Sequence, residues 1–183
     1  MANKISYNKF ENYPLVSYNI ASYLVENEDL IWKLLKYNDS DAWREDAEHP
    51  SLTREEKGSL IYSGQSEETD YRVFLDVGQE IAWKTQACIL RVFPYELEPS
   101  NYVHGDMIVA FEVFSHYRIN HLSNYTTRID TITQRILHNL NGQDVGGIGR
   151  LNFDPVSSNR IRSTLTGNVP YKGRVTLMHN WIG

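Results

Sequence analysis

The spacing of apolar residues changes once along this 183-residue chain, and that change limits the folds open to it. Before residue 66 the apolar residues recur at three- and four-residue steps, as on one face of an α-helix. From residue 71 onward the repeat is nearer two, as in strands, with one helical segment at 124–141. This order is typical of the α+β class, in which a helix covers one face of a sheet.

The N-terminal region predicts two helices and a shorter third one. Pro14 opens the first helix, and the second begins near Asn27, which serves as its N-cap. Thr53 and Glu56 have the spacing of a capping box, which predicts a short helix directly after Thr53. The apolar positions of the first two helices are Leu15, Ile20, Tyr23, Leu24, Ile31, Leu34 and Leu35.

Strands are predicted at 71–78 and 84–93, with breaks at Pro94 and Pro99. The clearest strand pattern covers 105–119. One of its faces holds Met107, Val109, Phe111 and Val113, and the other holds Glu112, His116 and Arg118.

Residues 124–141 predict one helix with a single apolar stripe. Asn124 is placed to cap its start, and Gly142 stands where a C′ glycine ends a helix. The stripe consists of Ile129, Ile132, Ile136, Leu137 and Leu140.

Together these segments predict an α+β fold, an antiparallel or mixed sheet with one long helix packed on it. The sheet includes 105–119, and an N-terminal helical region precedes it. We place that region at 1–65 and the α+β domain at 66–183, and expect one compact unit overall.

The stretch "NGQDVGGIGRL" (141–151) holds four of the eleven glycines and raises the question of a phosphate site. A phosphate loop follows a strand and opens a helix, whereas these glycines follow a helix and precede a strand. That order presents carbonyl groups, the wrong polarity for an anion. Gly142 is therefore interpreted as a helix stop, and Gly146, Gly147 and Gly149 as a bend.

The net charge of −5 disfavours a protein that grips nucleic acid by its phosphates, because such proteins carry a basic stripe. Cys88 is the only cysteine, which excludes an intramolecular disulfide and a cysteine-based zinc site. No segment is apolar enough to suggest a membrane anchor, so we expect a protein that is cytosolic when made.

The sequence shows no catalytic constellation and no cofactor-binding or metal-binding motif. His104 with Asp106 and His116 with His121 come nearest to ligand spacing, but neither pair matches a known metal signature. No Gly-x-Ser-x-Gly elbow is present, and Cys88 lies in the apolar run "ACIL".

The element order of strand pair, helix and further strands over residues 71–183 resembles the tail-terminator and neck proteins of tailed bacteriophages. The segments that carry the resemblance are "NYVHGDMIVAFEVFSHYRINHLSNYTTRIDTITQRIL", "GGIGRLNF" and "PYKGRVTLM". The resemblance implies a structural virion protein that forms a ring, usually a hexamer, in the neck or tail. It implies neighbouring neck, tail-tube or sheath proteins as partners, with DNA only passing through the lumen. An acidic surface suits such a channel.

A ring needs two different surface patches that complement each other. Twelve tyrosines and four tryptophans suit large subunit interfaces. The candidate interface residues are Tyr95, Tyr102, Tyr171 and Trp181, and the C-terminal strand is a candidate to add to a neighbour's sheet edge. The alternative for Trp181 is that it covers the core of its own domain.

Two other classes remain open from the sequence. One is a small hydrolase or nucleotide-binding enzyme with a pocket around Glu112, His116 and Asp130. The other is a monomeric adaptor that binds one partner protein through its aromatic residues.

Overall fold

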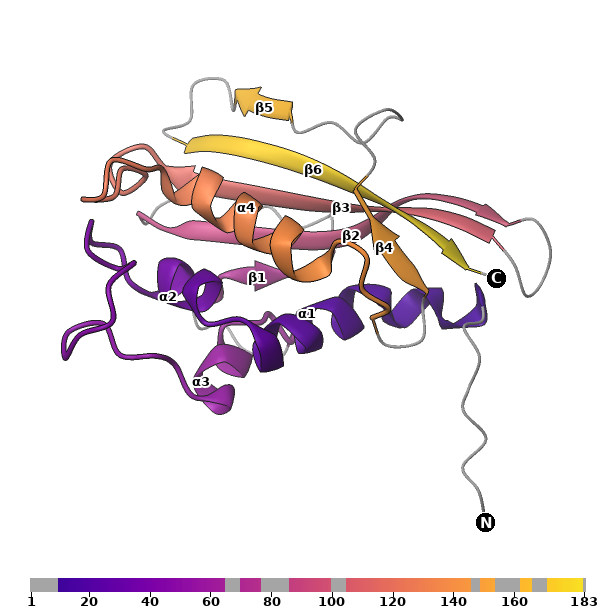
Figure 1. Cartoon of the computed structure of the whole chain (residues 1–183), viewed down its shortest axis with the longest axis horizontal. Helices are drawn as coiled ribbons and strands as arrows, with labels where there is room; N and C mark the ends of the chain where they lie inside the picture. The colour runs from indigo at the N-terminus through magenta and orange to yellow at the C-terminus, as the bar shows by residue number, and fades with distance from the viewer. Residues whose placement is uncertain are drawn as a thin grey trace, which may run out of the picture.

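The computed structural model describes residues 10–64, 70–76, 86–99, 105–145, 149–153, 162–165 and 171–182. These residues form two layers, a twisted sheet and a layer of helices that covers one of its faces (Figure 1). The α+β class predicted from the sequence is confirmed.

The sheet is mixed and has six strands in the order β1-β2-β3-β6-β4, with β5 also paired to β6. β1 runs parallel to β2, and every other pair is antiparallel. The strands are β1 (Val73–Phe74), β2 (Cys88–Pro99), β3 (Gly105–His116), β4 (Arg150–Asn152), β5 (Arg162–Leu165) and β6 (Tyr171–Ile182).

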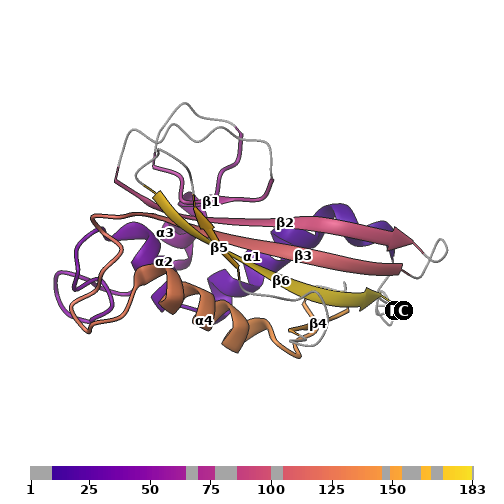
Figure 2. The same cartoon turned by 90° about the horizontal axis from the view of Figure 1, so that it is seen from above.

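The helical layer contains more than the one long helix expected. The helices are the 3₁₀ helix η1 (Phe10–Leu15), α1 (Val16–Asn27), α2 (Leu30–Lys36), α3 (Arg54–Ser59) and α4 (Arg128–Leu140). α4 packs on β3 and β6, while α1 and α2 pack on β2 and α2 also touches α4 (Figure 2). The N-terminal helices therefore cover the sheet together with α4, because one helix is too narrow to cover β2, β3 and β6.

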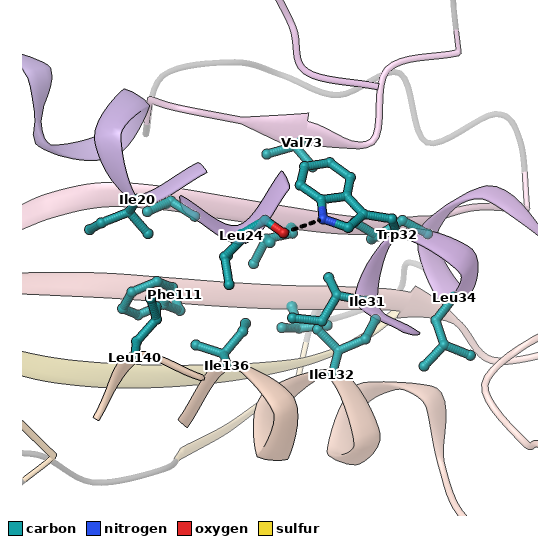
Figure 3. Close-up of a cluster of buried hydrophobic side chains, with 14 of the residues drawn as sticks. Ile20, Leu24, Ile31, Trp32, Leu34, Val73, Phe111, Ile132, Ile136 and Leu140 are labelled. Carbon is teal, nitrogen blue, oxygen red and sulfur yellow. Dashed lines mark hydrogen bonds between the residues drawn. The ribbon is translucent and has the colours of Figure 1, made fainter. Parts of the chain in front are cut away.

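A single hydrophobic cluster joins the two layers. Trp32 and Phe111 are fully buried within it, and the indole Nε1 of Trp32 donates to the carbonyl of Leu24 at 2.9 Å (Figure 3). The predicted apolar face of β3 is confirmed, since its four residues lie in this cluster. So is the stripe of α4, of which only Leu137 is partly exposed.

The N-terminal helices begin and end differently from the prediction. Pro14 lies inside η1, so α1 starts only at Val16, and Leu15 is 55% exposed. Asn27 ends α1 instead of opening α2. The acceptor that caps α2 is the carboxylate of Glu28, whose Oε1 receives the N–H groups of the next turn at 2.8 and 3.3 Å.

The cap of α3 was predicted correctly, whereas that of α4 was not. The capping box of Thr53 and Glu56 is present at the start of α3, as predicted. α4 begins four residues later than expected, because Thr127 caps it by accepting from the N–H of Asp130 at 3.1 Å. Asn124 instead accepts from Thr126 within the preceding loop.

β2 does not break at Pro94 but continues to Pro99. The register with β3 shifts between Pro94 and Glu96, which leaves Tyr95 as an extra residue in a β-bulge. A bulge lets the strand absorb a residue that cannot donate to the ladder, so the sequence rule for proline fails here.

The glycines after α4 have the predicted structural role where they are described. Gly142 has φ +79° directly after the helix cap, and its N–H donates to the carbonyl of Leu151 at 2.6 Å. Gly149 has φ +90°. Both backbone conformations favour glycine, whereas Gly146 and Gly147 lie outside the described residues.

Replacing Ile132 by Asp tests the packing of α4 on the sheet. Ile132 is 0% exposed, so a carboxylate there would be buried without a partner and should lower the free energy of unfolding by about 3 kcal/mol or more. Gln134→Asp, on the exposed side of the same helix, is the control and should stay within about 1 kcal/mol in chemical denaturation. Equal free energies of unfolding for the two variants would contradict the packing described.

Candidate functional site

The four predicted interface residues differ in what the structure says of them. Tyr95 projects from the β2 bulge and is 61% exposed. Tyr102 lies outside the described residues. Tyr171 and Trp181 lie in β6, where their backbones pair with His116 and Asp106 of β3.

The C-terminal strand β6 lies inside the sheet. It pairs with β3 along its whole length, and on its other side with β5 at 172–175 and β4 at 179–181. Most of its backbone hydrogen-bonding capacity is therefore used within its own chain, which leaves little for addition to a neighbour's sheet.

The outer edge of β2 is more open. β1 pairs with β2 only at Leu90 and Arg91, so within the described part of the chain 92–99 is paired on one side only. Pro94, the bulge and Glu96 are features that discourage uncontrolled strand pairing. Contacts at this edge would therefore be made by side chains such as Tyr95.

The residues of the enzyme hypothesis do not meet. Glu112 follows Phe111 in β3, so its side chain points to the sheet face opposite the helical layer. There Oε2 lies 3.5 Å from Arg91, and burial raises the pKa of Glu112 despite this charge. Asp130 belongs to α4 on the other face and accepts from Thr127 Oγ1 at 2.7 Å.

The remaining candidates for chemistry are also dispersed. His116 is buried, which lowers its pKa, whereas His121 is exposed and His104 lies outside the described residues. Burial raises the pKa of the Cys88 thiol to about 11, so it is an unreactive part of the core. Across the described ranges, no three His, Cys, Asp or Glu side chains gather as metal ligands would.

A groove of about 370 Å³ lies between α1, α3 and the end of β1, and we name it the α1–α3 groove. Its rim carries an ion pair between Glu26 and Arg54 at 2.8 Å. Gly58 lines it from α3, and a Cβ added there would meet open space. The apolar wall consists of Tyr18, Val25, Ile61, Tyr62 and Leu75.

The loop between β3 and α4 presents the most exposed large side chain among the described residues. Tyr125 is 101% exposed and has φ +65°, a left-handed conformation that is unusual for a bulky residue. Its N–H donates to the carbonyl of Leu122 at 3.1 Å, and the N–H of Leu122 donates to the carbonyl of Thr126 at 3.0 Å. The turn is thus closed on both sides of Tyr125.

A second loop fixes this turn from below. The N–H of Ser123 donates to the carbonyl of Ser40 at 2.9 Å, and its hydroxyl donates to Asp41 at 2.5 Å. The same hydroxyl accepts from the indole Nε1 of Trp43 at 2.9 Å. We name 117–127 with its Tyr125 the tyrosine loop; its position depends on contacts some 80 residues away in the sequence.

The 38–50 segment is itself held by His49. This buried imidazole lies between two carboxylates, with Nε2 at 2.9 Å from Asp39 and Nδ1 at 2.9 Å from Asp46. Burial by itself would lower the pKa of His49, but hydrogen bonds to Asp39 and Asp46 outweigh it and raise the pKa above 6.5. Only the imidazolium donates from both nitrogens at once.

Sequence reasoning missed both the groove and the tyrosine loop. The groove combines residues from three separate elements, so no local sequence pattern predicts it. The conformation of Tyr125 had no signal either, because left-handed positions are normally occupied by Gly or Asn.

Tyr125→Asn should stabilise the isolated protein. Asn tolerates the left-handed region, so the free energy of unfolding should rise by about 1 kcal/mol in urea denaturation. Tyr125→Ala is the matched control: it also removes the ring but keeps the backbone strain, and should differ from the parent by about 0.5 kcal/mol at most. The same gain in both variants would show that strain is not the cause.

We name His49 with Asp39 and Asp46 the His49 clamp, and its contacts predict a pH dependence of stability. The pKa of His49 is raised in the folded state. Its contribution to the stability of the fold is therefore complete below pH 6.5 and is lost as the pH rises through the folded-state pKa. The melting temperature of the parent should therefore fall across this range more steeply than that of His49→Gln. Parallel curves for the two proteins would contradict the clamp.

Neither a curated protein nor a solved structure matches this chain. No helix in the described ranges is long and apolar enough to cross a membrane. The YomW family model matches residues 27–179, which is most of the chain and includes every helix after α1 and nearly the whole sheet. The chain therefore belongs to the YomW family, a Bacillus phage-type family, and is a phage-associated protein.

Proposed function

We propose that this protein is a structural component of a tailed phage particle, a tail terminator or neck protein without enzymatic activity. In this role six copies form a ring that joins the portal side of the head to the tail. Neighbouring neck, tail-tube or sheath proteins are its partners, and DNA passes through the lumen.

The observation that carries the proposal is the order and packing of β2, β3, α4 and β6. A long antiparallel pair is followed by a helix that packs back on it, and a further long strand then lies beside β3. This is the order on which the resemblance to tail terminators rests. The phage type of the YomW family supports it from an independent direction.

The surface supports an assembly role better than an enzymatic one. The described residues expose several large tyrosines, among them Tyr18, Tyr95 and Tyr125, which suit protein interfaces. Of the titratable groups in the enzyme hypothesis, Asp130 lies in α4 on one side of the sheet, whereas Glu112 points to the opposite face. A net charge of −5 would keep a channel wall from adhering to DNA in transit.

A monomeric adaptor is the second candidate, and the α1–α3 groove favours it. A groove of this size suits one side chain or a short peptide from a partner. The two functions differ in solution mass, since an adaptor stays at 21.2 kDa and a ring forms multiples of it.

Deletion of the gene from the phage that encodes it tests the proposal. Electron microscopy of the lysate should show filled heads and separate tails in place of joined particles, and supplying the protein from a plasmid should restore infectivity. Mass spectrometry of purified wild-type particles should detect the protein in several copies per particle. Joined, infectious particles from the deletion phage would overturn the structural role.

A further inference from the structure

Two loops lie side by side at one end of the sheet, the 38–50 segment and the tyrosine loop, at the left of Figures 1 and 2. We propose that His49 is a pH-sensitive switch for both loops. As an imidazolium it holds them closed, and when it loses its proton they open together while the sheet and its helices stay folded. This inference goes beyond the proposed structural role and does not depend on it.

The His49 clamp needs a charged imidazole in order to hold both of its carboxylates. Nε2 of His49 lies 2.9 Å from Oδ1 of Asp39, and Nδ1 lies 2.9 Å from Oδ1 of Asp46. A neutral imidazole carries a single N–H, so one of the two carboxylates would then face a nitrogen lone pair. Loss of the proton therefore turns one attractive contact of this buried ring into a repulsive one.

Asp39 is the carboxylate that gives way. Oδ1 of Asp46 also accepts the backbone N–H groups of Glu48 and His49 at 3.0 and 2.9 Å, and these hold it against the ring. Oδ1 of Asp39 accepts the N–H of Asp41 at 2.9 Å, and the side chain of Asp39 is 50% exposed. The neutral ring therefore keeps its N–H on Nδ1 for Asp46, and Asp39 turns into the solvent.

A chain of hydrogen bonds connects Asp39 to the tyrosine loop. When the carboxylate of Asp39 turns away, the N–H of Asp41 loses its acceptor. The carboxylate of Asp41 accepts from the hydroxyl of Ser123 at 2.5 Å, and the same hydroxyl accepts from the indole Nε1 of Trp43 at 2.9 Å. Contiguous networks of this kind carry coupling between distant sites. Release of Asp39 thus loosens the residues that hold Ser123.

The tyrosine loop relaxes when Ser123 is released. Tyr125 has φ +65°, a left-handed conformation that persists only where surrounding contacts enforce it. One such contact is the N–H of Ser123, which donates at 2.9 Å to the carbonyl of Ser40, the residue between Asp39 and Asp41. Opening of the clamp therefore removes support from the strained turn at both the backbone and the side chain of Ser123.

The groups that face His49 from its own segment and from neighbouring elements keep their charge near neutral pH. Tyr37, at the end of α2, packs edge-on against the imidazole at 5.3 Å, and burial raises its pKa above 10. Arg128 of α4 donates to the carbonyl of Asp39 at 2.8 Å and remains a cation. Although burial opposes it, hydrogen bonds to His49 lower the pKa of Asp39 and Asp46. His49 is thus the group of the clamp that titrates near neutral pH.

A second histidine, His116, adjoins the tyrosine loop at the end of β3. Burial, together with the charge of Arg118, lowers the pKa of His116. It therefore changes charge below pH 6.5, whereas hydrogen bonds to its two carboxylates make His49 change charge above pH 6.5. The two histidines act in different pH ranges.

The opening is local because the core does not depend on the clamp. Within 38–50 only two residues are buried, Ala42 and His49. Arg128 and Lys33 attach the segment to α4 and α2 by donating to its backbone carbonyls, and these contacts do not involve the imidazole. Segments with few buried apolar side chains open at a free energy well below that of global unfolding.

Amide hydrogen exchange of the full chain, followed by NMR between pH 6 and 9, tests the switch. After correction for the intrinsic pH dependence of exchange, the protection of Asp41, Ser123 and Tyr125 should fall with rising pH. The fall should be about 10-fold per pH unit between 6.5 and the closed-state pKa of His49, and protection should be constant outside that interval. The amides of β3 and α4 should keep their protection. The ¹⁵N signals of His49 should show an imidazolium below the transition and an Nδ1–H ring above it.

Three variants identify the group responsible. His49→Gln does not titrate, so protection of both loops should be independent of pH. Asp39→Asn removes one of the two charges that favour the imidazolium and should move the transition to lower pH. His121→Gln is the matched control: it replaces an exposed histidine within the tyrosine loop and should respond to pH as the parent does.

Several outcomes would overturn the proposal. Protection of both loops that is constant from pH 6 to 9 in the parent would do so, as would a pH dependence that survives in His49→Gln. A fall at Asp41 without one at Ser123 and Tyr125 would reject the coupling between the loops. A parallel fall in β3 and α4 would mean global unfolding and not a local switch. If His49→Gln fails to fold, an unshifted transition in Asp39→Asn would reject the role of the clamp.

Discussion

The buried guanidinium of Arg128 is the contact on which the helical layer depends. The side chain is 0% exposed, and it donates to the carbonyls of Leu34, Tyr37, Asp39 and Ile119 at 2.5 to 3.0 Å. The first two close the C-terminal end of α2, where carbonyls lack helical partners and the helix dipole favours a cation. Burial lowers the pKa of Arg128, yet the group remains a cation at neutral pH. One residue at the start of α4 thus provides hydrogen-bond donors for backbone carbonyls of α2, of the 38–50 segment and of the turn after β3.

A second set of polar contacts joins the same layers, and here the central residue belongs to the N-terminal helices and its partners to α4. The carboxylate of Glu28 is buried; its Oε2 accepts from Arg135 at 2.7 Å and from Asn139 at 2.5 Å, while its Oε1 caps α2. Lys57 donates to the carbonyls of Val25 and Glu28 and so attaches α3 to the end of α1. A buried charge is tolerable only when it is paired and hydrogen-bonded, and these are. The helical layer is therefore fixed by polar contacts at its ends and by apolar packing in between.

This division explains what the sequence could predict. The stripe of α4, the apolar face of β3, the capping box at Thr53 and the glycine stop at 142 depend on residues a few positions apart, and all are present. The contacts by which Arg128 and Glu28 join α4 to the N-terminal region link residues 89 to 111 positions apart, and a charged residue in an amphipathic pattern is normally assigned to solvent. Pro94 failed as a strand break for a similar reason, because the bulge that accommodates it is visible only in the register with β3. The groove, built from three elements, is the least local feature and was not predicted at all.

The same contacts link the core to the tyrosine loop. Asp39 gives its backbone carbonyl to Arg128 and its carboxylate to His49, so the 38–50 segment is held at one point by the core and by a titratable clamp. That segment in turn holds Ser123, next to the strained turn of Tyr125. The entropy of ordering the loop is thus spent during folding. It also means that protonation of His49 stabilises the segment that supports the loop, because only the imidazolium donates to both Asp39 and Asp46.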